Sequence, residues 1–326
     1  MKLPRRQFLH LAAGAAALPA ISRVAMAQAY PTRPVRIVVG FAAGGTQDIA
    51  ARLIGQWLSE RTGQQFIVEN RSGAAGNLAA DAVVRAPGDG YTLLLVGLSN
   101  AANASLYDRL NFNFIRDIAP IAGIIRVPLI LEVHPSFSVE TVPEFIAYAK
   151  ANSGKISMAS AGGNGGPSYI TGELFKMMAG VDMLQVQYRG SGPALTDVIG
   201  GQVQGMFDPL PSSIEYVRSG TLRPLAVTTA MRSEALPGVP SVADFVPGFE
   251  ASAWYGVGAP RSTRPEIIDK LNREINAGLA DPTLKARLSD LGGMLIAGLP
   301  ADFGKLIAEE TEKWGKVVRF AGIKPG

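Results

Sequence analysis

The chain lacks cysteine altogether and has only two histidines, His10 and His134. The absence of cysteine excludes disulfides, thiolate metal sites and a cysteine nucleophile. With so few histidines, a His-rich metal site is excluded, and a Ser-His-Asp arrangement in the body of the chain would have to use His134. His134 stands before a proline at the end of an apolar run, which favours an ordinary turn residue. We therefore predict no catalytic residue, no metal site and no cofactor, and a protein that is not an enzyme.

The chain also lacks a charge surplus once its first residues are set aside. It holds 31 lysines and arginines and 27 acidic residues. Residues 1–27 contain four of the basic residues and none of the acidic ones, so the remainder is electrically balanced. A nucleic-acid partner needs a basic surplus or stripe, and neither is present. We predict no nucleic-acid binding.

The first 27 residues read as an export signal. Basic residues precede an apolar, alanine-rich run from Phe8 to Ile21, and Ala25-Met26-Ala27 supplies small residues at the spacing of a cleavage site. Arg5-Arg6 is typical of a twin-arginine signal, with general secretion as the alternative. We predict a signal peptide at 1–27, which also removes His10. No later run is long enough for a membrane helix, so we expect a soluble protein in the periplasm.

Strand-like and helix-like stretches alternate along the remaining 300 or so residues, which is typical of an α/β fold with mainly parallel sheets. A chain of this length usually exceeds one hydrophobic core, so two lobes are expected. The predicted strands are 35–39, 66–69, 92–96, 121–125, 129–133, 156–160, 184–187, 205–208 and 222–227. The predicted helices include 142–151, 169–179, 194–199, 211–218, 265–279, 282–291 and 301–320, two of which open with proline at or near the first helical position.

One stretch near the start of the mature chain has the pattern strand, glycine turn, helix. The β-branched run Val35–Val39 is followed by Gly44-Gly45, a possible N-cap at Thr46, and apolar residues at helical spacing. Glycine leaves the turn amides uncovered, and the first amides of a helix lack intrahelical acceptors. Such a turn can hold a carboxylate or phosphate without a basic side chain. An ordinary solvent-covered turn is the alternative.

A second stretch repeats this pattern. Ile156–Ser160 is strand-like, residues 161–168 are glycine-rich, and an amphipathic segment begins at Tyr169. The glycine spacing is not G-x-G-x-x-G and no Walker lysine follows, so nucleotide binding is poorly supported. Because ligands of α/β sheets bind beyond the carboxyl ends of the strands, the two turns suit one small anion held between two lobes.

A third glycine-rich piece, Gln187–Ala194, contains two residues that allow two interpretations each, and Asp208 after it is a third such residue. Tyr188 either bonds a ligand or packs in the core with its hydroxyl satisfied. Arg189 either clamps a carboxylate or is solvated, and we favour solvation. Asp208 either faces the ligand or caps the following helix with Pro209 at its first position, and we favour the cap.

Several separate motifs, in order along nearly all of the mature chain, resemble the periplasmic receptors of tripartite tricarboxylate transporters, the Bug family. They are Val38–Asp48, Val68–Asn77, Ala86–Leu93, Tyr188–Ser191, Gly201–Val203, Met206–Asp208, Leu222–Val227 and Lys313–Val318.

The resemblance implies a two-lobed, type II-like periplasmic binding protein with a ligand cleft between the lobes and two crossing hinge strands. We place the first part of lobe 1 at 30–127, lobe 2 at 128–253, and the second part of lobe 1, with the helical tail, at 254–326. We expect a monomer.

The resemblance also implies that a small carboxylate binds between the lobes, held mainly by backbone amides of loops 41–48 and 160–168. This chain departs from the family pattern at Tyr169, where a histidine is common, and at Gln187, where a proline is common, so ligand identity stays open. The predicted ligand-binding residues are Phe41, Ala42, Ala43, Gly44, Gly45, Thr46, Asp48, Ser160, Ala161, Gly162, Gly163, Asn164, Gly165, Tyr169, Tyr188 and Asp208.

The function implied is that of a solute-binding receptor. It captures a small carboxylate by closing its lobes and delivers it to membrane transporter subunits. One alternative is a sensor subunit that reports the same ligand to a membrane signalling protein. The other is an exported hydrolase, which the shortage of histidine disfavours.

Overall fold

The structure is a computed structural model that describes residues 30–107, 109–320 and 322–324. The predicted signal peptide at 1–27 lies outside the described residues. The fold set out below is that of the compact unit that begins at Arg33.

Ten strands of the described chain form one sheet, whose main path runs β2-β1-β3-β9-β4-β7-β5-β6, with β8 and β10 also paired to β4. The strands are β1 (Val35–Val39), β2 (Phe66–Asn70), β3 (Thr92–Gly97), β4 (Ile118–Val133), β5 (Ser157–Ala161), β6 (Leu184–Tyr188), β7 (Gly205–Pro209), β8 (Arg223–Val227), β9 (Ser252–Pro260) and β10 (Met294–Leu295).

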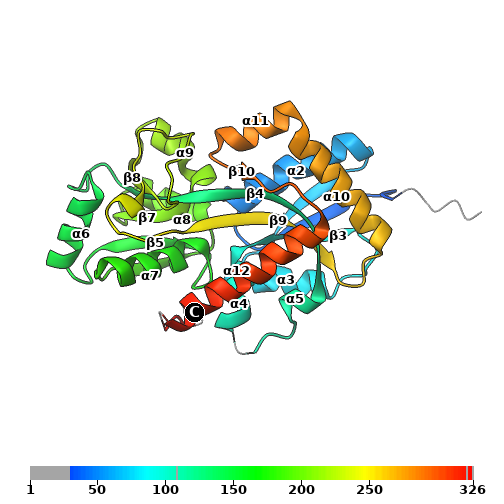
Figure 1. Ribbon diagram of the computed structural model, residues 1–326, viewed down its shortest axis with the longest axis horizontal. Helices are drawn as coiled ribbons and strands as arrows, with labels where there is room; N and C mark the ends of the chain where they lie inside the picture. The colour runs from blue at the N-terminus through cyan, green and yellow to red at the C-terminus, as the bar shows by residue number, and fades with distance from the viewer. Residues whose placement is uncertain (1–29, 108, 321, 325–326) are drawn as a thin grey trace, which may run out of the picture. The chain divides into compact units, whose positions relative to one another are not determined.

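Two long strands, β4 and β9, join the two ends of this sheet. They pair antiparallel from Ile118–Pro260 to Pro128–Ser252, and from Leu129 onward β4 pairs instead with β7 and β8. In Figure 1 they run side by side through the middle of the molecule, with β3 on one side and β5, β7 and β8 on the other. We call β1–β3, β9, β10 and residues 118–128 of β4 sheet segment 1, and β5–β8 with residues 129–133 of β4 sheet segment 2.

The long strands correct three sequence-based predictions. Residues 121–125 and 129–133 belong to one strand, β4, and β9 was not predicted at all. The sheet is mixed: the parallel pairs join β1 to β2 and β3, and β5 to β6 and β7, whereas every pair that includes β4 or β9 is antiparallel. The change of partners at Pro128 lies at a predicted lobe boundary, but the lobe boundaries themselves stay a prediction.

The α-helices cover the sheet, and several of them begin or end at a capping residue that the sequence supplies. Thr141 accepts from the Glu144 amide at the start of α6, Asp281 accepts from the first amides of α11, and Gly63 ends α2 with a left-handed φ of 72°. They are α2 (Thr46–Thr62), α3 (Asn77–Val84), α4 (Leu98–Leu106), α5 (Phe114–Asp117), α6 (Val142–Ala151), α7 (Pro167–Ala179), α8 (Ser191–Ile199), α9 (Leu210–Arg218), α10 (Pro265–Ala280), α11 (Pro282–Asp290) and α12 (Pro300–Phe320), with short 3-10 turns at Ala74–Gly76 and Val242–Asp244.

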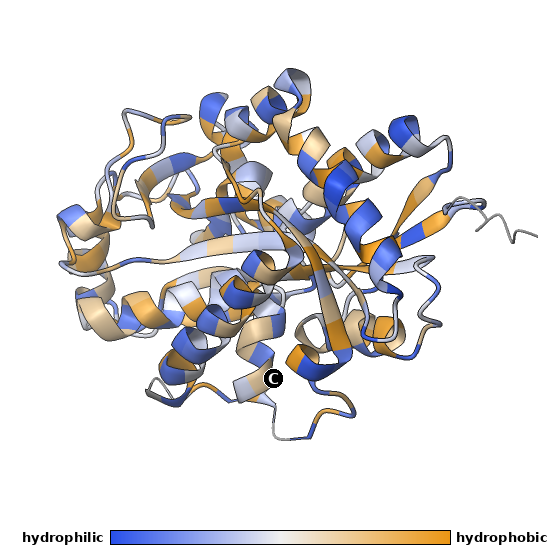
Figure 2. Cartoon of the chain, turned by 45° about the vertical axis from the view of Figure 1, so that its right-hand side comes forward, coloured by the Kyte–Doolittle hydropathy of each residue, from blue (hydrophilic) through white to orange (hydrophobic). Residues whose placement is uncertain are grey.

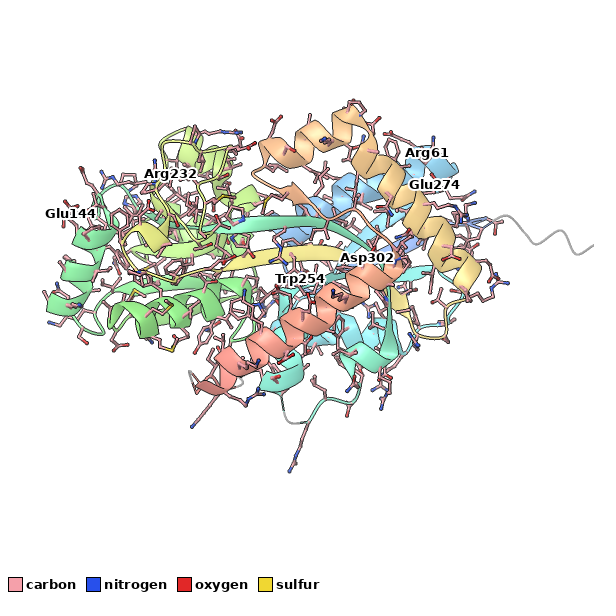
Figure 3. The ribbon with its side chains drawn as sticks, viewed as in Figure 1. Arg61, Glu144, Arg232, Trp254, Glu274 and Asp302 are labelled. Atoms are coloured by element: carbon pink, nitrogen blue, oxygen red, sulfur yellow. The ribbon has the colours of Figure 1, made fainter. Side chains whose placement is uncertain are left out.

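Figure 2 shows hydrophilic and hydrophobic residues alternating along these helices, as expected when one helix face packs on the sheet. The helix α12 packs on β9 and β4 through large buried side chains. Trp254 of β9 meets Phe303 of α12 edge-to-face, with ring centroids 5.8 Å apart, and Figure 3 shows Trp254 beside this helix. The same view shows Arg61 of α2 next to Glu274 of α10, an ion pair of 3.1 Å.

Candidate functional site

The amino ends of four helices meet at the carboxyl ends of strands from both sheet segments. Helix α2 follows β1, and α7, α8 and α9 follow β5, β6 and β7. The first amides of each helix lack intrahelical acceptors and stand at the positive end of its dipole. Four such ends around one point favour an anion there, in the place where open α/β sheets bind their ligands.

A cavity of about 30 Å³ lies among these helix ends. Sheet segment 1 contributes Phe41, the first turn of α2 and Tyr255 of β9, and sheet segment 2 contributes the starts of α7, α8 and α9. None of the described residues that line it is a lysine or arginine. The lining residues are Phe41, Gly45, Thr46, Gln47, Ala161, Pro167, Ser168, Gly190, Ser191, Pro209 and Tyr255.

The loops of the two sheet segments touch each other around this cavity. The amide of Ala42 donates to the carbonyl of Arg189 across 3.2 Å. The hydroxyl of Thr46 lies 3.4 Å from the carbonyl oxygen of Pro209 and 3.1 Å from Oγ of Ser212. The cavity is therefore enclosed by direct contacts between its two walls.

Glycine permits this close approach. A Cβ at Gly162 would lie 2.4 Å from Cε1 of Phe41, and Gly162 has a φ of +94°, which side chains rarely adopt. A Cβ at Gly192 would lie 2.5 Å from the carbonyl oxygen of Ala43. The glycines predicted to uncover backbone amides thus also let the two walls come together.

Two polar side chains of the cavity wall have an atom without a hydrogen-bond partner. The atoms are Oε1 of Gln47 and Oγ of Ser168, and both are buried. Ser160, at the end of β5, has a third such atom. Buried polar atoms without a partner are costly, so the cavity wall is suited to a polar ligand or to ordered water.

Asp48 faces away from the cavity, toward Arg52. Both nitrogens of the Arg52 fork donate to its carboxylate at 2.9 Å, and the amide of Gly44 donates to it at 3.1 Å. Burial opposes ionisation of Asp48, but these hydrogen bonds outweigh it and hold the pKa below its ordinary value. The Gly44 amide, predicted to face the ligand, is occupied within its own turn.

Two predicted helix caps are wrong. Helix α2 begins at Thr46, with Gly45 at the N-cap position, and the Thr46 side chain reaches the other wall of the cavity. Helix α9 has Pro209 at its N-cap position without a side-chain cap. Asp208 points inward from β7 and accepts from the hydroxyls of Ser191, Ser212 and Ser213, because those donors surround it in the folded sheet.

A second buried carboxyl group, Glu132 of β4, lies behind Asp208. Oγ of Ser213 is 2.6 Å from the Glu132 carboxyl and 3.0 Å from the Asp208 carboxyl. A serine has one proton to donate, so the second contact needs a proton on a carboxyl group. Burial, and then the charge of Asp208, raise the pKa of Glu132 well above its ordinary value, so Glu132 holds that proton.

None of the remaining predicted side chains described next is among those that line the cavity. The hydroxyl of Tyr188 donates to Asp197 at 2.7 Å, which is the packed-aromatic interpretation, and burial followed by this bond raises its pKa to about 12. Asn164 donates to the carbonyl of Lys324 and accepts from Gln187. Tyr169 is half-buried on α7, where burial, then Glu173, raises its pKa. Arg189 is exposed, as predicted.

Of the predicted site residues, Phe41, Gly45, Thr46 and Ala161 line the cavity. Ala42, Ala43, Gly44, Gly162, Gly163, Asn164 and Gly165 lie in the loops behind this lining, and contact of any of them with a ligand stays a prediction. Ser168, Gly190 and Ser191 also line the cavity and fall within glycine-rich pieces that the sequence marked. Tyr255 had no sequence signal, because its strand was not predicted.

Among the described residues there is no group of three or more acidic or histidine side chains that could hold a metal ion. Within the same residues, every helix is too short or too polar to cross a membrane.

Comparison with known proteins identifies the family. Residues 50–323 match the family described as the tripartite tricarboxylate transporter family receptor. The chain is 35% identical to BugT of Bordetella pertussis over 301 residues, which cover 91% of this chain and 92% of BugT. The chain belongs to this receptor family.

Solved structures of family members share the fold. The R. palustris protein Rpa4515, determined with adipate, superposes with a TM-score of 0.88 at 39% identity, covering 91% of this receptor and all of that chain. BugD gives a TM-score of 0.87 at 33% identity, covering 90% and 99%. MatC from Rhodopseudomonas palustris, determined with malate, gives 0.84 at 33% identity, covering 89% and 100%. These likenesses confirm the predicted family and the periplasmic-binding-protein fold class.

Proposed function

We propose that this receptor binds a small carboxylate in the cavity between its two sheet segments, as a periplasmic binding protein rather than as an enzyme. The convergence of four helix amino ends on a cavity without lysine or arginine carries the proposal. The related structures determined with adipate and with malate support the same ligand class.

Backbone amides are the anion-binding groups in this proposal. A negative group near one helix amino end gains about 0.3–1 kcal/mol, and up to about 2 kcal/mol when partly buried. Several helix ends acting on one carboxylate therefore replace the fixed positive charge of an arginine. The unpartnered hydroxyl of Ser168 adds a side-chain donor for the carboxylate, whereas the unpartnered atom of Gln47, Oε1, is an acceptor that suits a donor group of the ligand or a water molecule.

Binding is coupled to movement of the walls. The cavity of about 30 Å³ is small, and direct contacts join its two walls. The contacts between the Thr46 and Pro209 walls must therefore open before a ligand enters. Closure around the ligand is favoured only if its contacts are stronger in the closed arrangement than in the open one.

A matched pair of ligands tests the carboxylate. A thermal-shift screen of the exported protein compares small mono-, di- and tricarboxylates with their primary amides. An acid at 100 times its Kd should add about 2.7 kcal/mol to the free energy of unfolding, and its amide much less. Equal shifts from acid and amide would contradict an amide-lined anion site.

We further propose that the loaded receptor delivers its ligand to membrane transporter subunits. The family to which the chain belongs supports this step. The test is uptake of radiolabelled ligand by vesicles that contain the membrane subunits of a tripartite tricarboxylate transporter. Uptake should depend on the added receptor. Binding without receptor-dependent uptake, together with activation of a neighbouring membrane kinase, would favour the sensor role instead.

A further inference from the structure

The start of α8 holds a hydroxyl whose proton has a fixed direction. Ser191 lines the cavity, and its Oγ donates to Oδ1 of Asp208 across 2.5 Å. Among the described residues, the Asp208 carboxylate is the acceptor to which the Ser191 hydroxyl donates its proton. A hydroxyl has one proton and two lone pairs. Ser191 therefore presents hydrogen-bond acceptors to its surroundings, including the cavity.

Asp208 holds this orientation firmly. It is fully buried, and Ser212 and Ser213 donate to its other oxygen, Oδ2, at 2.5 and 3.0 Å. No lysine or arginine among the described residues donates to it. Three further groups face Asp208 from elements packed against it. Thr46 is linked to Asp208 by way of the Ser212 hydroxyl, and Glu132 by way of the Ser213 hydroxyl. The third group is Tyr255 of β9. The Asp208 charge is thus balanced by hydroxyl dipoles, all of which turn their protons toward it.

The cavity lining consequently offers two kinds of hydrogen-bonding group, donors and an acceptor. The helix amino ends and the free hydroxyl of Ser168 offer donors, which suit a carboxylate. Ser191 offers an acceptor, with a buried negative charge directly behind it. Ser168 and Ser191 line the same cavity, so the donors and the acceptor face one bound ligand. A carboxylate alone accepts from these donors but leaves the lone pairs of Ser191 without a donor.

We propose that the preferred ligand carries a hydroxyl or ammonium group beside the bound carboxylate, and that Ser191, oriented by Asp208, accepts a hydrogen bond from that group. This inference rests on the proposed carboxylate-binding function and narrows its ligand class to hydroxy and amino acids. Asp208 acts as a positioning residue, because it reaches the ligand only through Ser191.

The test compares ligands that differ only in the donor. Calorimetric titration of the exported protein measures malate and aspartate against succinate, and 2-hydroxyadipate and 2-aminoadipate against adipate and 2-oxoadipate. The donor-bearing member of a pair should bind at least tenfold more tightly than the member without a donor. The hydroxyl and ammonium arms identify which donor the Asp208 charge favours.

The variant Asp208→Asn should reverse the orientation of Ser191. In the variant, the amide oxygen takes the place of Oδ2 and accepts from Ser212 and Ser213. The amide nitrogen takes the place of Oδ1 and donates to Oγ of Ser191. The Ser191 proton is released toward the cavity, so the tenfold preference should disappear or turn toward 2-oxoadipate. Ser191→Ala should bind both members of a pair within about threefold. Asp197→Asn, a matched change on α8 at the Tyr188 contact, should keep the wild-type preference.

The outcomes separate this inference from the function on which it rests. If no acid of any pair binds at millimolar concentration, the carboxylate function fails. If acids bind but wild type does not discriminate, only the donor inference fails. If Asp208→Asn does not fold, as judged by circular dichroism and urea unfolding, Ser191→Ala decides: a preference that survives there overturns the inference, and its loss supports it.

Discussion

Glu132 and Asp208 are fully buried carboxyl groups on neighbouring strands, β4 and β7, joined through one serine hydroxyl. Burial raises the pKa of Asp208 to about 6, against the opposing effect of its three serine donors. Burial also raises the pKa of Glu132 well above 4.5. A carboxyl group whose pKa is raised by folding binds its proton more tightly in the folded state. Its contribution to stability is therefore full at low pH and is lost as pH rises through the folded pKa.

Glu132→Gln should remove the pH dependence of one of these groups. Glutamine keeps a donor toward Ser213, as protonated glutamate does, but it cannot ionise. The free energy of unfolding of the variant relative to wild type should therefore rise above about pH 4.5, by up to about 1.4 kcal/mol per pH unit until the folded pKa is reached. Urea unfolding between pH 4 and pH 8 measures the difference. The exposed Glu250→Gln serves as the control, and parallel pH profiles for wild type and Glu132→Gln would refute the buried-proton assignment.

At the scale of one element, the start of α8 sets how closely the cavity walls approach. Gly192→Ala should weaken carboxylate binding at least tenfold, because its Cβ would lie 2.5 Å from the carbonyl oxygen of Ala43 on the other wall. Because this close contact exists without ligand, it opposes the gain of up to about 1 kcal/mol that alanine brings to a helix, so the free energy of unfolding should not rise. Calorimetry and urea unfolding on the same variant measure the two effects.

Gly238→Ala is the matched control, since a Cβ there meets nothing within 4 Å. It should leave carboxylate affinity unchanged. Wild-type affinity in Gly192→Ala would show that the two walls do not need to meet for binding.

Helix α12 is fixed to both long strands through Glu310. The Glu310 carboxylate accepts from Arg126 of β4 at 3.3 Å and from the indole of Trp314 at 2.8 Å, and Arg126 also donates to Ser252 of β9. Glu310→Ala leaves a half-buried arginine and a buried indole N–H without this acceptor. We expect a loss of about 2–3 kcal/mol in the free energy of unfolding, measured in urea. The neighbouring exposed Glu309→Ala should cost less than about 0.5 kcal/mol, and equal losses would refute the role of Glu310.

At the scale of the whole molecule, opening of the cavity requires the loops on β1 and β6 to separate. A Cβ at Gly190 would lie 3.2 Å from Cβ of Ala42, close to the 3.5–4.5 Å of disulfides. Ala42→Cys combined with Gly190→Cys should therefore form a disulfide that holds the walls together. We expect the oxidised double variant, prepared without ligand, to bind its carboxylate at least 100-fold more slowly than the reduced form in stopped-flow fluorescence.

The chain has no native cysteine, so each single variant is a clean control and no competing disulfide can form. Dithiothreitol should restore rapid binding to the double variant. Rapid binding by the oxidised form would show that ligand reaches its site without separation of these loops.

Much of the fold could be predicted because its elements carry local signals. The strand Val35–Val39 and the helix Val142–Ala151 have the predicted bounds, and the prolines at 265 and 282 begin their helices as expected. The prediction was less complete where pairing with other strands decides the length of an element. Residues 121–125 and 129–133 were predicted as two strands, but β4 continues through Pro128 because the stretches on both sides of it pair with other strands.

The glycine-rich turns before α2, α7 and α8 are local features, so the sequence by itself determined that amide-rich helix starts would form after β1, β5 and β6. The sequence pattern also determined the family. Only the tertiary structure decided the directions of Thr46 and Asp208. A cap competes with every other partner within reach. Here the Pro209 carbonyl is the partner of Thr46, and serine hydroxyls of α8 and α9 are the partners of Asp208. The Thr46 partner lies 163 residues away and Ser191 lies 17 residues from Asp208 on another element, so no local pattern could reveal that Asp208 orients Ser191 at the cavity wall.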